Sequence, residues 1–266
     1  MNARRAELDL RKEKLAGELG EPITVDGLTR DVVIFQRRRG HRHSTDDLLT
    51  AWYAVTHAPA RVGTILDLGT GIGSVGLAVA WRFADAELTA IEVQDVSYRL
   101  LCENVEANGM GARVRAVHGD LRGRVRDLPA ESFDLVTGSP PYFDVKTGIV
   151  SADPQRAGAR FELHGDVGDY CRAARRALAP GGVFVFCFPT VQRARAERAA
   201  RDADLTIARS RDVIPKEGVA PLFSLFACTG AAAEEAPVLE PPHVVRDARG
   251  APTPAHLAAR AVFGMV

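Results

Sequence analysis

Short apolar runs alternate with segments of helical periodicity along most of the chain. The apolar runs, which predict buried strands, cover residues 64–68, 87–92, 114–118, 133–137, 182–188, 205–210 and 222–228. Apolar residues recur at helical spacing over residues 74–84, 95–107, 167–178 and 191–203. This alternation predicts an α/β fold with a seven-stranded, mostly parallel sheet. Because no clear helix separates the last two runs, we expect an antiparallel edge strand.

The N-terminal part of the chain follows a different pattern, which predicts a helix and a hairpin that cap the sheet. Residues 3–18 have the spacing of an amphipathic helix. Alternating apolar residues lie on both sides of Asp26 and Gly27, and this pair is typical of a hairpin turn. The sequence therefore predicts a helix followed by a two-stranded hairpin before the main sheet begins.

We expect a single domain over residues 1–266. Residues 1–58 would form the N-terminal cap and the segment that leads into the sheet, and residues 59–230 the α/β core. Residues 231–266 would form a C-terminal extension, because the segment 231–254 is rich in alanine and proline. This extension is expected to be an extended connection followed by a short terminal helix.

Composition narrows the class of protein. The chain has 266 residues, of which 46% are hydrophobic, so it can bury a sizeable core. Basic and acidic residues both number 34, a balance that counts mildly against binding many phosphates. The four cysteines show no C-x-x-C pairing, so we expect reduced cysteines and no metal site. The absence of a signal peptide or membrane-length apolar run favours a cytoplasmic protein.

A glycine-rich turn follows the first strand of the expected core. Gly69, Gly71 and Gly73 would let the backbone approach a ligand closely where the strand turns into a helix. The next strand ends at Glu92, an acidic residue placed to hydrogen-bond both hydroxyls of a ribose. The third strand is followed by Asp120 and Leu121, which are placed to reach an adenine amino group.

The spacing of Gly71, Gly73 and Gly76 also matches the dinucleotide fingerprint. Asp67 at the end of the strand would repel a pyrophosphate. Glu92 also follows Gly76 at a shorter distance in the sequence than the acidic residue of that fingerprint does. A ligand with a cationic methionine moiety and no phosphate suits Asp67 better. We therefore favour S-adenosylmethionine over a dinucleotide, with a degenerate, empty fold as the remaining alternative.

The tetrapeptide Ser139, Pro140, Pro141 and Tyr142 follows the apolar run 133–136. The Ser139 oxygen and a backbone carbonyl of the Pro-Pro segment could each accept one N–H of a planar amine. Tyr142 could stack on the ring that carries this amine. Such an arrangement would hold a delocalised nitrogen in line for a methyl group, although a proline-rich turn after a strand is the plain structural alternative.

At these residues the chain resembles the class I S-adenosylmethionine-dependent amino-methyltransferases, and in particular the bacterial tRNA(Val) adenine-N6 methyltransferase family. The resemblance covers about residues 30 to 260. Besides the two motifs, it rests on Gln36, on residues 40–42 and 157–164, on the Ser44-x-Asp46-x-x-Leu49-x-Ala51 pattern, and on residues 241–245. It implies a Rossmann-like class I fold, S-adenosyl-L-methionine as cofactor and S-adenosyl-L-homocysteine as product.

The resemblance also implies roles for further residues. Asp46 lies in the segment that closes over the cofactor in that family. From their positions in the sequence, Arg42 could order the catalytic segment or contact substrate, and Arg156 and Arg160, in the loop after Tyr142, are candidate contacts to substrate phosphates. Phe143, beside Tyr142, could extend the stacking surface for the substrate or pack inward. The densest basic run, at residues 37–43, could contact phosphates or be a solvated loop.

Two departures from the family bear on the acceptor. The family usually has asparagine where this chain has Ser139, and it tends to carry basic residues where segment 215–220 is nearly uncharged. The first hypothesis is methyl transfer to adenine N6 in tRNA, as part of tRNA processing. The alternatives are an N-methyltransferase that acts on a protein glutamine or a small-molecule amine, and a cofactor-binding protein without catalysis.

Overall fold

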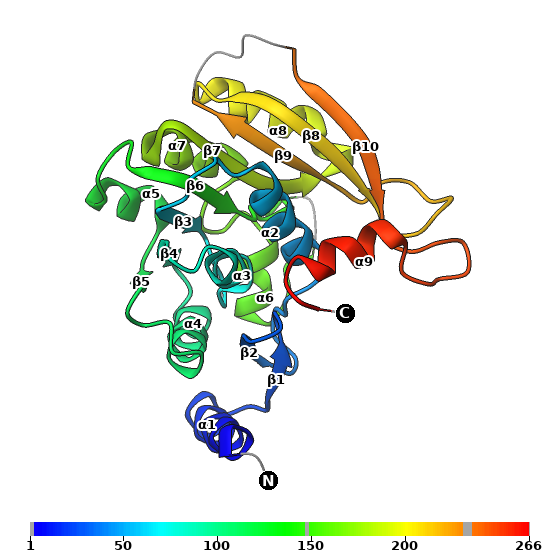
Figure 1. Ribbon diagram of the computed structural model, residues 1–266. Helices are drawn as coiled ribbons and strands as arrows, with labels where there is room; N and C mark the ends of the chain where they lie inside the picture. Colours follow the sequence, from blue (N-terminus) through cyan, green and yellow to red (C-terminus); the bar gives the residue numbers. More distant parts are fainter. Residues whose placement is uncertain (1–2, 147–148, 231–235, 266) are drawn as a thin grey trace.

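One large sheet lies at the centre of the computed structural model, which describes residues 3–146, 149–230 and 236–265. Within these residues it has eight strands: β3 (Thr64–Leu68), β4 (Glu87–Glu92), β5 (Val114–His118), β6 (Phe133–Gly138), β7 (Leu178–Pro189), β8 (Thr206–Ile214), β9 (Phe223–Thr229) and β10 (Val238–Val244). Their order across the sheet is β10–β8–β9–β7–β6–β3–β4–β5 (Figure 1).

The strands from β3 to β7 are parallel, as the alternating pattern predicts. β9 is antiparallel to both β7 and β8, and it therefore lies inside the sheet, not at its edge. The edge is β10, an eighth strand from a segment expected to be an extended connection. Its pairing with β8 shifts register between Glu240 and His243, where two prolines without an N–H interrupt the strand. The expected α/β, Rossmann-like fold is confirmed, with one strand more than predicted.

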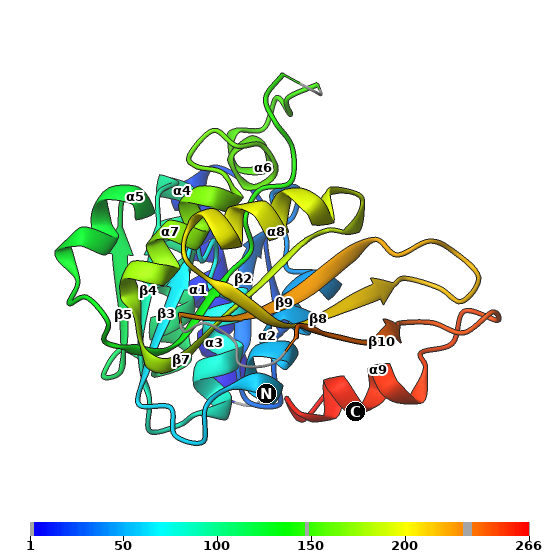
Figure 2. The same ribbon diagram turned by 90° about the horizontal axis from the view of Figure 1, so that it is seen from above.

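Helices cover both faces of the sheet. They are α1 (Ala3–Leu19), α2 (Thr45–His57), α3 (Ser74–Arg82), α4 (Asp95–Ala107), α5 (Leu121–Arg124), α6 (Pro154–Arg160), α7 (Val167–Ala177), α8 (Arg193–Asp202) and α9 (Pro254–Ala261), with short 3-10 turns at Val125–Asp127 and Thr190–Gln192. Figure 2 shows α5, α7 and α8 on one face and α2, α3 and α9 on the other. Consecutive residues of β6 serve the two layers, because Leu135 packs into one core and Val136 into the other.

The N-terminal hairpin is present, but its turn lies later than expected. β1 (Ile23–Gly27) and β2 (Val33–Arg37) are antiparallel, and Asp26 and Gly27 pair with Ile34 and Val33 inside the ladder. The turn is formed by residues 28–32, where the Leu28 N–H donates to the Val32 carbonyl. The Asp26 side chain is used for hydrogen bonds to neighbouring residues, which explains an aspartate in the strand.

Asn104 of α4 and Asn108, the residue that caps the end of this helix, fasten the hairpin to the core. Asn104 accepts a hydrogen bond from the Phe35 N–H at 2.6 Å and donates to the Phe35 carbonyl. Asn108 makes the same pair of bonds to Val33, at 2.9 and 2.7 Å. Side-chain amides thus take the place of a third strand and satisfy the free edge of β2. The first half of β2 is thereby held against the C-terminal part of α4.

The sheet changes direction between its neighbouring strands β3 and β6. From β3 the chain goes outward to β4 and β5, and it then returns to place β6 on the other side of β3. In open α/β sheets, ligands bind outside the carboxyl ends of the strands at such a switch point. The carboxyl ends of β3, β4, β5 and β6 are therefore where a site is expected.

No helix among the described residues is long and apolar enough to cross a membrane.

Candidate active site

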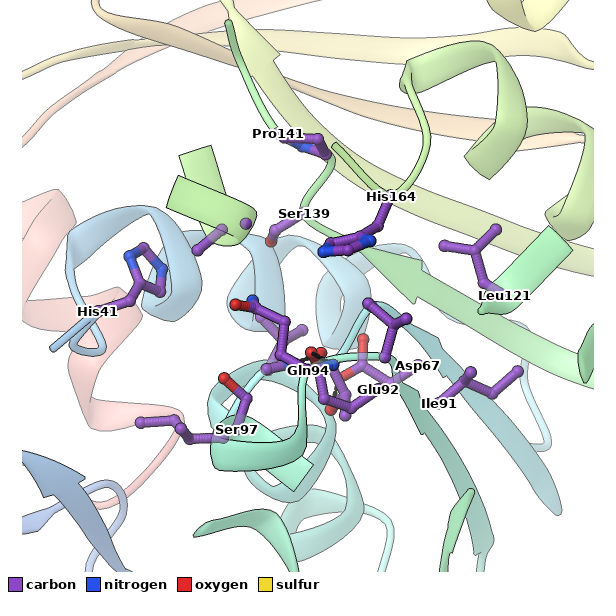
Figure 3. Close-up of a pocket in the computed structure, with 18 of the residues that line it drawn as sticks. His41, Asp67, Ile91, Glu92, Gln94, Ser97, Leu121, Ser139, Pro141 and His164 are labelled. Atoms are coloured by element: carbon purple, nitrogen blue, oxygen red, sulfur yellow. Dashed lines mark hydrogen bonds between the residues drawn. The ribbon is translucent and has the colours of Figure 1, made fainter. Parts of the chain in front are cut away.

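A pocket opens at the carboxyl ends of these four strands (Figure 3). Its wall includes these residues expected from the sequence: Asp67, Gly69, Gly71, Glu92, Leu121, Ser139 and Pro141. Figure 3 shows Ser139 and His164 on one side of the pocket and Glu92 and Gln94 on the other. The structure thus brings the glycine turn and the Pro-Pro loop, about 70 residues apart, to one cavity.

Asp67 is the fully buried carboxylate of the glycine turn. Its Oδ2 accepts hydrogen bonds from the Thr70 hydroxyl at 2.5 Å and the Gly76 N–H at 3.0 Å. Its Oδ1 accepts one from the Thr137 hydroxyl at 2.7 Å. Burial raises the pKa of Asp67, and the three donors oppose that rise. In this arrangement Asp67 ties the turn to the start of α3 and to β6.

The three glycines of the turn serve different purposes. All have positive φ, at 58° for Gly69, 61° for Gly71 and 93° for Gly73. A side chain on Gly69 would collide with the Tyr170 hydroxyl, and one on Gly73 would lie 2.8 Å from a methyl group of Leu101. A side chain on Gly71 would meet no atom within 4 Å, so this side of the backbone faces open space in the pocket. Gly73 therefore packs α3 on α4, while Gly71 leaves room for a ligand.

Glu92 lies beside the glycine turn and is only 3% exposed. One carboxylate oxygen accepts the Gly71 N–H and the other accepts the Gln94 N–H, each at 2.8 Å. Burial raises the pKa of Glu92, and the backbone N–H groups of Gln94, Gly71 and Val93 oppose the rise. A carboxylate has about four acceptor positions, so these donors leave capacity for a ligand.

Asp120 lies beside the pocket, whereas its neighbours Gly119 and Leu121 line it. It caps α5 by accepting the Arg122 N–H at 2.9 Å, and it also pairs with the Arg122 guanidinium. The hydrogen bond from the Arg122 side chain is the main reason why the pKa of Asp120 is lowered. A ligand that used this carboxylate would share it with Arg122.

The first turn of α2 carries two adjacent aspartates with different environments. Asp46, expected from the sequence to contact the cofactor, accepts a hydrogen bond from the Tyr142 hydroxyl at 3.1 Å. Asp47 lines the pocket and accepts the Ser44 N–H at 2.9 Å. Burial and the Asp46 charge raise the pKa of Asp47 well above its usual range. The carboxylate at the pocket wall is thus one residue later than the sequence suggests.

The loop after β6 presents Ser139 and Pro141 to the pocket, while Pro140 is buried behind them. The Ser139 hydroxyl lies 3.6 Å from the thiol of Cys187, which is fully buried on β7. Burial raises the pKa of Cys187 to about 12, so it is a neutral thiol at physiological pH. Cys187 therefore supports Ser139 as a weak hydrogen-bonding neighbour and is no nucleophile.

Tyr142 is fixed on several sides. Its hydroxyl contacts Cys187 at 3.2 Å as well as Asp46, and its ring meets Phe188 edge-on with centroids 5.9 Å apart. Its N–H donates to the Arg160 carbonyl at 3.1 Å, and its own carbonyl accepts from Gln192. Burial is the main reason why the pKa of Tyr142 is raised well above its usual range. These contacts hold the Pro-Pro loop between α2, β7 and α6.

Several pocket residues were not identified from the sequence. Besides Asp47, they include His41, Gln94, His164 and Tyr170. Tyr170 and Gln94 are ordinary helix-region residues whose position depends on how α7 and α4 pack, which no local motif reveals. His164 precedes α7, whose cap is Asp166. Asp47 belongs to the capping box that Ser44 begins at the start of α2, and this spacing is a local signal in the sequence.

The candidate substrate residues fall into two groups. Arg42 donates to Thr24 and pairs with Asp26 of the hairpin, so its charge is used within the cap. Arg156 and Arg160 are exposed on α6, and the Arg160 guanidinium lies 5.6 Å from the centroid of the Phe143 ring. Phe143 is 39% exposed. The structure thus leaves the α6 residues available to a ligand and Arg42 occupied.

Comparison with known proteins finds a matching family and individual sequence relatives. The family model for the methyltransferase small domain matches residues 47–195. A tRNA1(Val) (adenine(37)-N6)-methyltransferase from Flavobacterium johnsoniae is 31% identical over 160 residues, which cover 59% of this chain and 65% of that protein. The protein of the same name from Aeromonas hydrophila is 32% identical over 172 residues, which cover 64% and 69%.

Solved structures share the fold. A protein from Agrobacterium tumefaciens, described as a predicted O-methyltransferase, matches with a TM-score of 0.66 at 21% identity. The match covers 84% of this chain and 98% of that one. P. horikoshii TYW2 in complex with MeSAdo matches with a TM-score of 0.54 at 16% identity, over 83% and 82% of the two chains.

Proposed function

This chain belongs to the methyltransferase small domain family, and we propose that it methylates the N6 amino group of an adenine in tRNA. Family membership makes it an S-adenosylmethionine-dependent methyltransferase. Relatives named tRNA1(Val) (adenine(37)-N6)-methyltransferase support the choice of acceptor. The observation that carries the proposal is that Ser139 and Pro141 line the same pocket as the glycine turn and Glu92.

The residues of the pocket fit S-adenosylmethionine. Gly71 exposes its backbone to open space, and Glu92 lies beside it with acceptor positions left over for a ribose diol. Leu121 and Ile91 offer apolar surface for the adenine ring, and Asp120 follows Gly119 near its amino group. Asp47 is a further carboxyl group in the pocket wall, on the side formed by α2, and suits a cationic amino group.

When bound, S-adenosylmethionine supplies a methyl group that is electrophilic because it is attached to a sulfonium. The protein's part is to hold the acceptor nitrogen. The Ser139 oxygen and the Pro140 carbonyl would each accept one N–H of the adenine amine, which draws its lone pair out of conjugation. Catalysis is then mainly alignment and relief of developing charge.

The proton needs no dedicated base. A methylated ammonium on an aromatic ring is strongly acidic, so it loses its proton to water once the methyl group has been transferred. The thiol of Cys187 beside Ser139 is neutral and is not ionised to act as such a base. The products are the N6-methylated adenine and S-adenosylhomocysteine.

Tyr142 is the proposed stacking partner of the target base. An enzyme that acts on a stacked base must turn it out of the stack, and an aromatic ring replaces part of the lost stacking. The hydroxyl bond to Asp46 and the contact with Phe188 hold this ring in one orientation. A fixed ring costs less conformational entropy on binding than a mobile one.

Methylation of tRNA tests the proposal. The protein would be incubated with S-adenosylmethionine labelled in its methyl group and with unfractionated tRNA that lacks the modification, and the RNA would then be digested to nucleosides. We expect label in N6-methyladenosine, and much less of it at limiting S-adenosylmethionine when Glu92→Ala replaces the wild type. Label in another nucleoside, or in added protein or amine acceptors alone, would contradict the proposed acceptor.

A further inference from the structure

Arg37 joins the end of β2 to the start of α6. Its guanidinium donates to Asp153 at 2.8 Å and to Gln155 at 3.1 Å, and it also pairs with Glu21. The Arg37 side chain is only 13% exposed, and that of Asp153 only 14%. The His41 N–H donates to the same Gln155 oxygen at 3.2 Å. Two segments more than 110 residues apart in sequence are thereby clamped together.

Arg37 is engaged in this clamp and is not available to a ligand. Its neighbours in the basic run are not engaged in this way. Arg38 and Arg39 are exposed at the end of β2, and Arg156 and Arg160 are exposed on α6. None of these four guanidinium groups has a carboxylate within 4 Å in the part of the chain that the structure describes, whereas Arg37 and Arg42 both do. Asp153, the acid between the two segments, is already used by Arg37. Four positive charges without an ion pair within 4 Å among the described residues therefore lie on the two clamped segments, and Asp153 offsets only that of Arg156 in part.

These segments form one rim of the active-site pocket. His41 lines the pocket directly after Arg39 and Gly40, and Gly158 and Ala159 line it directly before Arg160. Burial lowers the pKa of His41, the Asp46 charge opposes this effect, and the Arg160 charge adds to it. If a polyanion bound to these two segments, one of its residues would lie at the opening of the pocket.

Phe143 adds an aromatic surface to this rim. Its ring is 39% exposed, lies against the Arg160 guanidinium and pairs through its backbone with Phe161. It follows Tyr142 directly, so it lies next to the proposed position of the target base. Exposed aromatic rings beside unpaired cations are the usual means of binding single-stranded nucleic acid, whose bases stack while its phosphates are neutralised.

We propose that this rim, made of Arg38, Arg39, Arg156, Arg160 and Phe143, binds the single-stranded RNA segment that carries the target adenine. The arginines neutralise the phosphates on either side of the adenine, and Phe143 stacks on a neighbouring base. The proposal rests on the proposed function, because it assigns a binding surface to that same substrate. It names unpaired bases in a loop, and not a duplex, as the form of RNA that is recognised.

Binding of unfractionated tRNA, measured by fluorescence anisotropy over a range of salt concentrations, tests the rim. Two double variants, Arg38→Ala/Arg39→Ala and Arg156→Ala/Arg160→Ala, each remove two phosphate contacts. Each should reduce the slope of log affinity against log salt by about 1.4, given about 0.7 per phosphate on a single strand. Affinity at about 0.1 M salt should fall at least about tenfold.

Phe143→Ala separates stacking from charge. It should lower tRNA affinity at least about fivefold at every salt concentration and leave the slope unchanged, because base stacking releases no counterions. Arg198→Ala/Arg201→Ala on α8 is the matched control, since both arginines are exposed and have no recorded ion pair within the described residues. This control should bind tRNA like the wild type. Calorimetric titration with S-adenosylhomocysteine shows that each variant is folded.

The proposed role of the rim is wrong if both double variants keep the wild-type tRNA affinity and salt slope. It is also overturned if the α8 control weakens binding as much as they do, because binding would then follow total charge. If the wild type transfers methyl groups to tRNA and the rim variants bind tRNA normally, only the rim is wrong. If the wild type binds S-adenosylhomocysteine but transfers no methyl group to tRNA, the proposed substrate is wrong and the rim falls with it.

Discussion

The hydroxyl of Tyr142 donates a hydrogen bond to Asp46 at 3.1 Å, which joins residues 96 positions apart in the sequence. Tyr142 belongs to the Pro-Pro loop and Asp46 to the first turn of α2, beside the pocket residue Asp47. The loop proposed to hold the acceptor is thus tied to the helix that forms the cofactor side of the pocket. The bond couples the positions of the two reactants.

Tyr142→Phe removes this bond and keeps the ring. A hydrogen bond to a charged group contributes about 1.5–3 kcal/mol, so we expect kcat for methyl transfer to fall by about tenfold or more. The affinity for S-adenosylhomocysteine should change little, because Tyr142 does not line the pocket wall near Glu92. Asp46→Asn, which retains an acceptor oxygen, should lose less activity. Single-turnover experiments measure the methyl-transfer rates of both variants. Equal rates for Tyr142→Phe and wild type would show that the bond does not contribute to catalysis.

Glu92→Ala tests the proposed grip on the ribose. Two charge-assisted hydrogen bonds would be lost, each about 1.5–3 kcal/mol, so calorimetry with S-adenosylhomocysteine should show at least about tenfold weaker binding. Glu92 also accepts the Gly71 and Gln94 N–H groups, so loss of local structure must be separated from loss of contact. Glu92→Gln keeps one acceptor oxygen and should bind with intermediate affinity. Undiminished binding by a folded Glu92→Ala protein would remove this residue from the site.

The clamp made by Arg37 predicts an effect on stability. Arg37→Ala leaves Asp153 and Glu21, both largely buried, without their cation, and should lower the free energy of unfolding by about 1–3 kcal/mol. Arg38→Ala, one residue later and exposed, should stay within about 0.5 kcal/mol of the wild type. Urea denaturation measures both values. Equal stability of the two variants would mean that the hairpin is held without the clamp.

A buried histidine pair between β10 and α9 predicts a dependence of stability on pH. His243 and His256 lie 3.3 Å apart, nitrogen to nitrogen, and Trp52 of α2 and Arg211 of β8 lie on the other sides. Burial, the His256 charge and the Arg211 charge lower the pKa of His243 to about 4. The unfolded chain, with an ordinary histidine pKa of about 6.5, therefore binds more protons between these two values.

Stability from this group is complete above about pH 6.5 and is lost as the pH falls toward 4. From pH 7 to pH 5, the free energy of unfolding should fall by about 2 kcal/mol through His243 alone. His243→Phe should reduce the loss over this interval by that amount, while the other histidines contribute equally to both proteins. Urea denaturation at the two pH values gives the comparison. The same loss in variant and wild type would mean that His243 is protonated in the folded protein.

Local motifs identified the chemistry of this site because the residues of each motif lie close together in the sequence. The glycine turn, Glu92 at the end of β4 and the Ser139 loop are each followed or preceded by an apolar run that predicts a strand. Parallel strands bring their carboxyl ends to one edge, so the pocket at this edge follows from the alternating pattern. The order β6–β3–β4 needs only the usual right-handed crossovers.

The features that the sequence did not reveal depend on packing between distant segments. Whether Asp46 or Asp47 faces the pocket depends on the rotation of α2, and adjacent residues on a helix point about 100° apart. Arg37 and Arg38 are identical in type, yet only Arg37 meets Asp153, more than a hundred residues away. β10 contains two prolines, which argue against a strand unless it lies at a sheet edge.

Ser139→Ala tests the acceptor site at the residue where the chain departs from its relatives. If the hydroxyl accepts an N–H of the target amine, this bond strengthens as positive charge develops on the nitrogen. The variant should therefore lower kcat more than it raises KM, the pattern of an interaction made mainly in the transition state. By analogy with one donor of an oxyanion hole, the barrier should rise by about 2–4 kcal/mol. Full activity would mean that the Pro140 carbonyl and Tyr142 position the amine without Ser139.

Ser139→Asn is the sharper test, because it introduces the residue usual in the family. The Ser139 hydroxyl rests 3.6 Å from the buried thiol of Cys187, so a longer side chain must extend into the pocket toward the acceptor. If serine is a simple substitute for asparagine, the variant should keep substantial methyl transfer to tRNA. If the pocket is shaped for another acceptor, transfer should collapse while S-adenosylhomocysteine still binds. Cys187→Ala in the same background gives the added amide more room, so it should restore transfer where crowding against the thiol is the cause and leave it absent where the acceptor itself is different.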